Sequence, residues 1–489
     1  MQNGLRSRGR NIRWAVLALV GLAGVVWAIA VPRPVLYVVG VLLCLPLVVA
    51  VIPRRVVGVL AAVIVLVAAI AVPKIALVAQ TRGDVRWSAA LKDQVSMSTP
   101  INVWTIGERI YLLSAEQPLR AFDKTSGRLL ADYPDARYKA TAVAADGSVV
   151  GWSHDDEVTY YAADGGKLWT KPFRGRGAIG SLNMYTPVVA AADGVVVLAD
   201  CTVQLPAKPC RWTGLDRSGR TVWEQQDDRA AVYTPARTFM FNRTIAPLPS
   251  VLLGLDKTGE FGAYVVRAAA DGRELGRRPA QPLTSLGLQG DLVVIAERVG
   301  DDCRLVGLRA GKQVLATQGM PCVEGPDGKL PGFLRLTPDR AYLEDSGNAR
   351  TVSLKDGSWR SVTGLTFSTG DEPAVAGSDV IIYRNGSKLS AVDAASGKPL
   401  WSKTAPGKVV EVYVDNGGLL VFSRPRLHNP LFSGEDGAIQ ASSWVAATGE
   451  RTGTRLIRDG DATRGAATGP GEALLVNYRA ATTQLLGTR

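Results

Sequence analysis

Histidine and acidic residues can bind metals or act as acids and bases, but few of them in this chain are arranged in a way that suits such chemistry. The only histidines are His154 and His428, which argues against a histidine-based metal cluster or a two-histidine mechanism and leaves at most a triad that uses one of them. The acidic runs at 155–157 and 301–302 are candidate Ca²⁺ ligands or solvated turns. No Walker phosphate loop, G-x-S-x-G elbow or H-E-x-x-H motif is present. We therefore expect no catalytic or metal-binding residues.

Cysteine spacing predicts structural bonds rather than reactive thiols. Cys201 and Cys210 are close in sequence, as are Cys303 and Cys322, and we expect a disulfide within each pair in an oxidising compartment. Free buried thiols are the alternative. A metal site is disfavoured because neither pair has a C-x-x-C spacing or a nearby histidine. Cys44 lies in an apolar run and is interpreted as a small apolar residue.

One hairpin signature recurs about eight times along the chain. Each copy has alternating residues, a small-residue turn that ends in glycine, and a second short strand that often ends in tryptophan. The turn glycines are spaced 39 to 53 residues apart. The copies are 121–130, 161–169, 214–223, 267–275, 307–315, 352–359, 391–401 and 445–451, with turn glycines Gly127, Gly166, Gly219, Gly272, Gly311, Gly357, Gly397 and Gly449.

A hairpin repeated at this spacing, with β-rich sequence between the copies, predicts the blades of a β-propeller. Arg82 to Arg489 comprises 408 residues, or 51 for each of eight blades. We expect eight four-stranded blades, with seven or nine as alternatives. Trp87 lies in a segment typical of a final strand, and 471–489 is typical of two strands without a final partner. We expect these chain ends to pair and close the ring, which removes exposed sheet edges.

Three copies, AFDKTSGRLL, GLDRSGRTVW and AVDAASGKPLW, resemble the A-x-D-x-x-x-G-x-x-x-W repeat of quinoprotein-like (PQQ-like) β-propellers. That family includes quinoprotein alcohol dehydrogenases and a propeller lipoprotein that assists outer-membrane barrel assembly. The resemblance extends over Arg82 to Arg489 and implies an eight-bladed ring. It also implies that four tryptophans pack between blades: Trp169, Trp223, Trp359 and Trp401.

The resemblance does not imply cofactor binding by this chain. In the cofactor-dependent members, the quinone lies at the ring centre with a divalent cation, typically between a tryptophan and a disulfide of adjacent cysteines, with an aspartate as base. This chain has no adjacent cysteine pair and no C-x-x-C-H motif. We therefore expect no cofactor. A membrane-bound PQQ-dependent dehydrogenase is retained as the alternative from the enzyme class.

The first 81 residues have a membrane-protein composition. Residues 1–83 contain no Asp or Glu, and three uncharged apolar runs of 17 or 18 residues occupy 14–31, 35–52 and 56–72. Runs of this length approach the minimum for crossing a bilayer about 30 Å thick. We expect a basic cytoplasmic tail at 1–13 and three transmembrane helices within 14–81; a cleaved signal peptide is the alternative for the first run.

Positive charges predict the orientation of these helices. Four arginines precede the first run, one lies between the first and second runs, and two lie between the second and third. Placing the larger groups in the cytoplasm puts residues 82–489 on the extracytoplasmic side of the plasma (inner) membrane. That part carries 48 basic and 44 acidic residues, so we expect no nucleic-acid partner.

The remaining candidates for function are long connections between strands. Residues 226–250 and 424–437 combine arginines and aromatic residues, which are enriched at protein interfaces. Their alternative role is to pack against their own loops. We expect a membrane-anchored, non-enzymatic binding or scaffold platform for an envelope protein or component, with a cell-wall glycan-binding module as a further alternative. The candidate partner-binding residues are Arg424, Arg426, His428 and Phe432.

Overall fold

The described residues, which begin at Val85, form β-strands joined by turns and loops. The computed structural model describes residues 85–91, 101–114, 117–136, 141–152, 157–173, 188–200, 210–227, 229–230, 243–244, 246–256, 262–281, 284–322, 333–345, 348–363, 374–377, 379–425, 439–457, 463–477 and 481–487. All the regular elements described are strands, and none of the described segments is a helix long and apolar enough to traverse a bilayer. The expected tail at 1–13 and spans within 14–81 lie outside the described residues.

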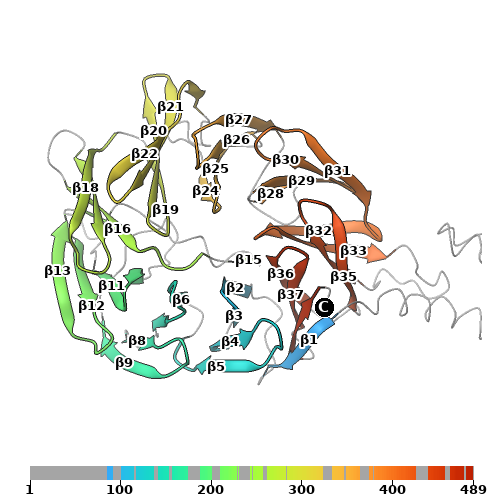
Figure 1. Ribbon diagram of the computed structural model, residues 1–489, viewed down its shortest axis with the longest axis horizontal. Helices are drawn as coiled ribbons and strands as arrows, with labels where there is room; N and C mark the ends of the chain where they lie inside the picture. Colours follow the sequence, from blue (N-terminus) through green and yellow to red (C-terminus); the bar gives the residue numbers. More distant parts are fainter. Residues whose placement is uncertain are drawn as a thin grey trace, which may run out of the picture.

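Nine sheets, each built on four antiparallel strands, are arranged side by side around one ring as its blades (Figure 1). The first three blades take their strands in chain order from the centre outward. Blade 1 contains β2 (Ile101–Ile106), β3 (Arg109–Ser114), β4 (Leu119–Asp123) and β5 (Leu129–Tyr133). Blade 2 contains β6 (Ala142–Val143), β7 (Val149–Trp152), β8 (Glu157–Tyr161) and β9 (Lys167–Pro172). Blade 3 contains β10 (Val188–Ala192), β11 (Val195–Asp200), β12 (Cys210–Leu215) and β13 (Thr221–Asp227).

Blades 4 to 6 include two departures from this order. Blade 4 contains β14 (Arg229–Ala230), β16 (Val251–Asp256), β17 (Ala263–Ala268) and β18 (Glu274–Pro279), while β15 (Arg243–Thr244) pairs with β2 of blade 1. Blade 5 contains β19 (Thr284–Gln289), β20 (Leu292–Val299), β21 (Asp302–Arg309) and β22 (Lys312–Ala316), with β23 (Met320–Pro321) also paired to β21. Blade 6 contains β24 (Phe333–Leu336), β25 (Arg340–Asp345), β26 (Asn348–Ser353) and β27 (Trp359–Thr363).

The last three blades complete the ring. Blade 7 contains β28 (Ala374–Ala376), β29 (Val380–Asn385), β30 (Lys388–Asp393) and β31 (Pro399–Thr404). Blade 8 contains β32 (Gly407–Asp415), β33 (Gly418–Pro425), β34 (Ile439–Val445) and β35 (Glu450–Ile457). Blade 9 contains β36 (Thr463–Gly469), β37 (Glu472–Asn477), β38 (Thr482–Leu486) and β1 (Val85–Ala90).

The ring has nine blades, so the expected count of eight is wrong. The eight hairpins counted in the sequence each join the third and fourth strands of one blade. Blade 9 has no such hairpin, because its third strand β38 ends the chain and its fourth strand β1 begins the propeller. These two strands pair antiparallel, with Val85 opposite Leu486. The predicted closure by the chain ends is confirmed, and the same closure hides one blade from a count of turns.

The repeat motif interlocks neighbouring blades. In blade 7, Asp393 accepts hydrogen bonds from the backbone and hydroxyl groups of Ser396, and Gly397 has a φ of 73°. A β-bulge follows, because Val392 lies opposite Pro399 whereas Ala391 lies opposite Trp401. The indole of Trp401 then donates a 2.8 Å hydrogen bond to the carbonyl of Ala446 in blade 8. The local turn chemistry therefore sets the contact between blades.

Three of the four predicted inter-blade tryptophans fit this pattern, and so does Trp87 at the ring closure. Each indole donates to a carbonyl in the next blade's turn: Trp87 to Lys124, Trp169 to Asp216, Trp223 to Ala269 and Trp401 to Ala446. The turn glycine of the second copy is Gly165, with a φ of 92°, rather than Gly166.

Trp359 does not occupy the expected position. Its indole donates to the carbonyl of Gln318 in the preceding blade. In the pairing of β26 with β27, Val352 lies opposite Trp359 and Thr351 lies opposite Arg360. No residue is left unpaired between them, whereas blade 7 has a bulge at this point. Arg360 therefore stands where Trp401 stands in blade 7, and its guanidinium donates to the carbonyls of Asp393 and Ala394 in the next blade.

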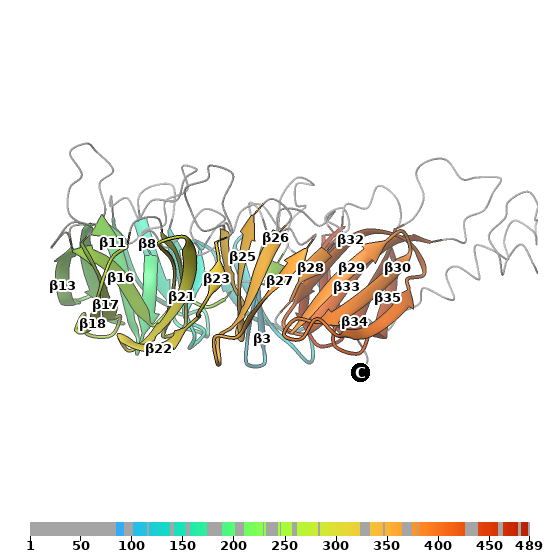
Figure 2. The ribbon, with the colours of Figure 1, turned by 90° about the horizontal axis from the view of Figure 1, so that it is seen from above.

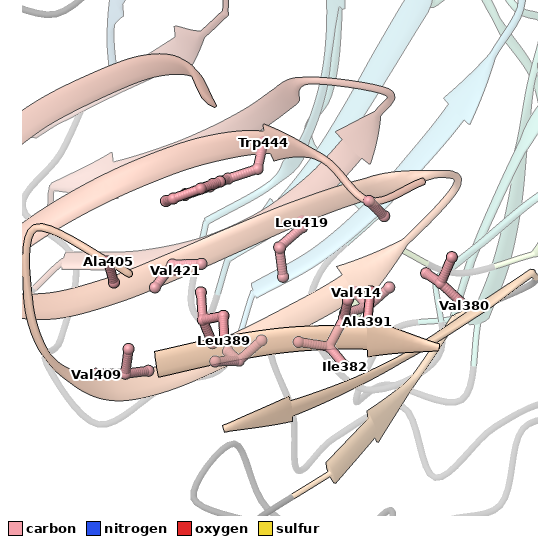
Figure 3. Close-up of a cluster of buried hydrophobic side chains, with 12 residues drawn as sticks. Val380, Ile382, Leu389, Ala391, Ala405, Val409, Val414, Leu419, Val421 and Trp444 are labelled. Carbon is pink, nitrogen blue, oxygen red and sulfur yellow. The ribbon is translucent and has the colours of Figure 1, made fainter. Parts of the chain in front are cut away.

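The cores lie between adjacent blades. Figure 3 shows the cluster in which aliphatic side chains of β29 and β30 in blade 7 face those of β32 and β33 and Trp444 of β34 in blade 8. Val380, Leu389, Leu419 and Val421 are all less than 4% exposed. Because each sheet is covered on both sides by its neighbours, its strands show runs of buried residues as well as alternation.

Candidate functional site

The two faces of the ring differ in how the strands are connected. Turns between the first and second strands and between the third and fourth strands share one face, which we call the turn face. In blade 1, for example, the amide of Lys124 donates to the carbonyl of Glu108 in the neighbouring turn. The remaining connections leave from the opposite face, which we call the loop face. Figure 2 shows the strands running between the two faces, with the C-terminus at the turn face.

The middle of the ring is crossed by the chain itself. We call the described parts of this crossing, β14, β15 and residues 246–250, the strap. β14 is the innermost strand of blade 4, and β15 pairs parallel with β2 on the far side, with Arg243 opposite Asn102 and Thr244 opposite Val103. β15 also contacts β36 of blade 9 (Figure 1). The strap therefore joins blades that are not neighbours.

The end of the strap is tied to three more blades. The amide of Leu248 donates to the carbonyl of Val143 in blade 2 at 2.8 Å, and the carbonyl of Pro249 accepts from Ala191 in blade 3 at 2.9 Å. The amide of Ser250 donates to Gly290 in blade 5. The predicted functional insertion at 226–250 thus includes a structural crossing of the ring centre. Its aromatic residues Tyr233, Phe239 and Phe241 lie outside the described residues.

Blade 5 carries a long hairpin whose turn lies at the loop face. β20 and β21 are paired along their whole length, from Leu292 opposite Arg309 to Val299 opposite Asp302. Only Gly300 and Asp301 form the turn. We call this segment the blade 5 hairpin. At its tip, Val299 is 46% exposed. The sequence pointed to residues 301–302 only as candidate Ca²⁺ ligands or a solvated turn. The structure places them at this turn, and no group of three or more possible ligands is present among the described residues. The Gly-Asp pair between two alternating runs is a usable signal for a two-residue hairpin.

A disulfide fastens this hairpin close to its turn, where Cys303 lies opposite Arg298. Cys303 on β21 is bonded to Cys322, and the Cα atoms of the two residues are 4.6 Å apart. β23 pairs with the same strand, with Met320 opposite Cys303. The hairpin is therefore held by both a covalent bond and strand pairing. Cys210 is also disulfide-bonded; Cys201 lies outside the described residues.

Buried charges reinforce the hairpin on the side that faces blade 4. Glu297 on β20 is fully buried, and its Oε1 accepts from Arg278 of β18 at 2.6 Å and from Arg304 of β21 at 2.5 Å. Because a carboxylate without these cations would be costly to bury, the cluster joins blades 4 and 5. A second buried pair, Asp227 with Arg267 at 2.7 Å, joins blades 3 and 4.

Only the first two residues of the predicted partner-binding loop, Arg424 and Pro425, are described. Arg424 lies near the end of β33, opposite Lys408, and its side chain is exposed. Arg426, His428 and Phe432 lie outside the described residues. Because β33 ends and β34 begins at the loop face, the connection between them leaves from that face. Arg424 and the blade 5 hairpin are therefore on the same side of the ring.

The described residues contain no evident catalytic grouping. Both histidines lie outside them, and no group of three or more His, Cys, Asp or Glu side chains in the described ranges could hold a metal ion. Burial raises the pKa of several tyrosines, including that of Tyr342 to about 12, and its hydroxyl donates to the carbonyl of Gly377 at 2.6 Å. A hydroxyl hydrogen bond from Ser218 is the main cause that lowers the pKa of Asp216 to about 2. These shifts belong to inter-blade contacts and turns.

Comparison with known proteins gives one family match. The model of a family described as outer membrane protein assembly factor BamB matches residues 340–481, which is less than a third of the chain. The matched region runs from blade 6 into blade 9. No curated protein is significantly similar to the chain.

Several solved propellers are distantly similar. BamB from Moraxella catarrhalis is 11% identical, with a TM-score of 0.39, over 76% of this chain and 97% of that one. A quinohemoprotein alcohol dehydrogenase from Pseudomonas putida HK5 is 12% identical, with a TM-score of 0.36, over 83% and 76%. A europium-containing methanol dehydrogenase is 12% identical, with a TM-score of 0.36, over 71% and 86%. Likenesses at this level indicate no function.

Proposed function

Because this chain is a PQQ-like β-propeller, we propose that it is a non-enzymatic platform that binds a protein or other component of the cell envelope. In this proposal, the three apolar runs within 14–81 anchor it in the plasma membrane and residues 82–489 lie on the extracytoplasmic side. The loop face is the recognition surface. The matched family description names an assembly factor, which fits a role in holding other proteins.

The blade 5 hairpin is the observation that supports this proposal most strongly. It presents Val299 with 46% of its surface exposed. The Cys303–Cys322 bond and the buried Glu297 cluster hold the hairpin below that tip. A rigid hairpin loses little conformational entropy on binding. A tip that presents an exposed valine beside the exposed Asp301 and Asp302 therefore suits recognition of a protein surface. Arg424 on the same face would extend the contact.

The quinone-dependent dehydrogenase is not favoured. Its cofactor would lie at the ring centre, where β15 of the strap pairs with β2. The glycan-binding alternative depended on loop aromatics that lie outside the described residues, and no described contact favours it over protein binding.

Site-specific photo-crosslinking in intact cells tests the platform. A photo-crosslinking amino acid replaces Val299 at the loop face or, as the matched control, Val222, which is 50% exposed near the turn face. We expect a reproducible cross-linked protein from position 299 that is absent from position 222. The proposal would be contradicted if both positions gave the same cross-linked proteins. It would also be contradicted if neither position 299 nor other exposed positions on the loop face gave any.

The proposed sidedness has its own measurement. A tag after Arg489 should be accessible to an impermeant reagent added outside intact cells, because three crossings place the C-terminus outside. A tag that becomes accessible only after lysis would contradict the extracytoplasmic placement, whatever the crosslinking shows.

A further inference from the structure

Both ends of the propeller leave the ring at the turn face. The first residue of β1, Val85, lies opposite Leu486, the last residue of β38. Their common position follows from blade 9, in which β37 and β38 meet at the loop face and β38 then runs back to the turn face. Figure 2 shows the C-terminus at this face. The first described residue, Val85, therefore lies at the turn face.

The turn face also carries most of the exposed aliphatic side chains. Large hydrophobic residues with at least 38% exposure among those described are Leu129, Leu168, Val222, Val299, Val314 and Leu400. All but Val299 lie in the first three residues of a fourth strand, directly after the turn. Leu168, Val222, Val314 and Leu400 are the extra residues of β-bulges, which leaves them pointing away from the inter-blade core.

Charges at the turn face largely neutralise one another. Salt bridges there join residues of opposite sign within or between turns. They are Lys124–Glu472 at 2.8 Å, Arg217–Asp146 at 3.3 Å, Arg220–Asp216 at 3.4 Å, Arg273–Asp271 at 3.6 Å and Arg309–Asp291 at 3.1 Å. A polybasic lipid-binding surface would instead leave an excess of one sign. Any lipid contact at this face would therefore be mainly apolar and weakly sensitive to salt.

From these observations we propose that the propeller stands with its turn face toward the bilayer and rests there through the aliphatic rim formed by Leu129, Leu168, Val222, Val314 and Leu400. The loop face then points away from the membrane, with the blade 5 hairpin free to meet a partner. This inference depends on the membrane anchor of the proposed function. It adds which surface of the propeller meets lipid.

Energy transfer from two positions of blade 7 tests the orientation. A clickable amino acid carrying a donor dye replaces Ala395 in the turn between β30 and β31, or Asn385 at the end of β29 on the loop face; both are exposed. The full chain is reconstituted into phosphatidylcholine vesicles with an acceptor on the headgroups. Because a six-residue strand is about 20 Å long, we expect about twofold greater transfer from position 395.

Rim variants test the lipid contact. Val222→Gln with Leu400→Gln should reduce transfer from position 395 toward that from position 385. Gln226→Ser with Thr404→Gln changes exposed residues near the other end of the same strands and should leave transfer unchanged. The effect should persist in high salt. Unchanged unfolding midpoints establish that both variants are folded.

Each result separates this inference from the proposed function. If the chain does not float with the vesicles, the anchor fails and the orientation fails with it. If the chain floats but transfer is equal from both positions or greater from Asn385, only the orientation is overturned. If position 395 is closer to lipid but the rim variants have no effect, the apolar contact is overturned.

Discussion

Two neighbouring blade junctions place different chemistry in the same position. Between blades 7 and 8, the indole of Trp401 covers Gly449 and donates one hydrogen bond to the Ala446 carbonyl. Between blades 6 and 7, Arg360 covers Gly397 and donates to two carbonyls. One junction depends mainly on apolar contact, and the other on charge-assisted hydrogen bonds. At these two junctions, the side chain that covers the glycine also donates to the next turn, and it need not be an indole. At other junctions the turn glycine faces Ala131, Gly276 or Leu315 instead.

The glycine on the receiving side should be the most sensitive part of the indole junction. A Cβ at Gly449 would lie 2.6 Å from Trp401 Cδ2, and the φ of Gly449 is 62°. We expect Gly449→Ala to destabilise the protein by about 3 kcal/mol, because backbone strain adds to a clash with a partly buried ring that is packed against the inter-blade core. The measurement is the urea unfolding midpoint of the full chain in detergent.

Gly386 supplies the control for this substitution. Its φ is 61°, but nothing lies within 4 Å of an added Cβ. Gly386→Ala should therefore cost only the backbone term, about 1 kcal/mol. Equal effects at both glycines would mean that the indole does not constrain the turn.

Truncating the two donating side chains should give unequal losses. Trp401→Ala removes a large ring that packs against the buried cluster between blades 7 and 8, so we expect a loss of about 3 kcal/mol. Arg360→Ala removes hydrogen bonds from a partly exposed side chain and should cost about 1 kcal/mol. The urea concentrations at the unfolding midpoints give the two losses of stability, provided that the dependence of the unfolding free energy on urea concentration is the same in both variants. A larger loss for Arg360→Ala would reverse the interpretation of the two junctions.

The geometry of Arg360 gives a smaller and more specific effect. Its Nε donates to Ala394 at 2.8 Å and its Nη2 donates to Asp393 at 3.1 Å. A lysine has one terminal nitrogen and cannot reproduce this fork. We expect Arg360→Lys to recover less than half of the stability lost in Arg360→Ala. Full recovery would show that charge and chain length suffice.

Acid should weaken the turns through their aspartates. The pKa of Asp216 is lowered from 3.8 to about 2, first by the Ser218 hydroxyl and further by backbone amides. Because the folded pKa lies below the unfolded one, this stabilisation is present above about pH 4 and disappears as the pH falls through 2. Thermal unfolding between pH 4 and pH 2 should lose less stability in Asp216→Asn than in the unchanged protein.

Ser218→Ala refines the acid experiment. It removes the hydroxyl that donates to Asp216 at 2.6 Å but leaves the amides of Ser218 and Arg220. The pH dependence should therefore become intermediate. An unchanged profile in Ser218→Ala would show that the hydroxyl does not set the pKa of Asp216.

Local sequence predicted the repeating unit well because its determinants are local. The aspartate–serine–glycine turns, the strands on either side of them and three of the four selected tryptophans depend on residues within about ten positions of one another. The candidate site was predicted less well. Its strongest described element, the blade 5 hairpin, has an ordinary sequence. It is distinguished only by the pairing of its strands, in which Arg298 and Val299 continue past the last partner of β19 and β23 pairs with β21 beside the turn.

The sequence by itself determined the all-β class, the turn chemistry and the pairing of the chain ends. Only the tertiary structure decided the nine blades, the replacement of an indole by Arg360 and the strap that crosses the ring centre. The physical reason is that these three features depend on register and closure between segments far apart in the chain. A missing bulge residue shifts the register by one position, and a closed ring places the first strand beside the last.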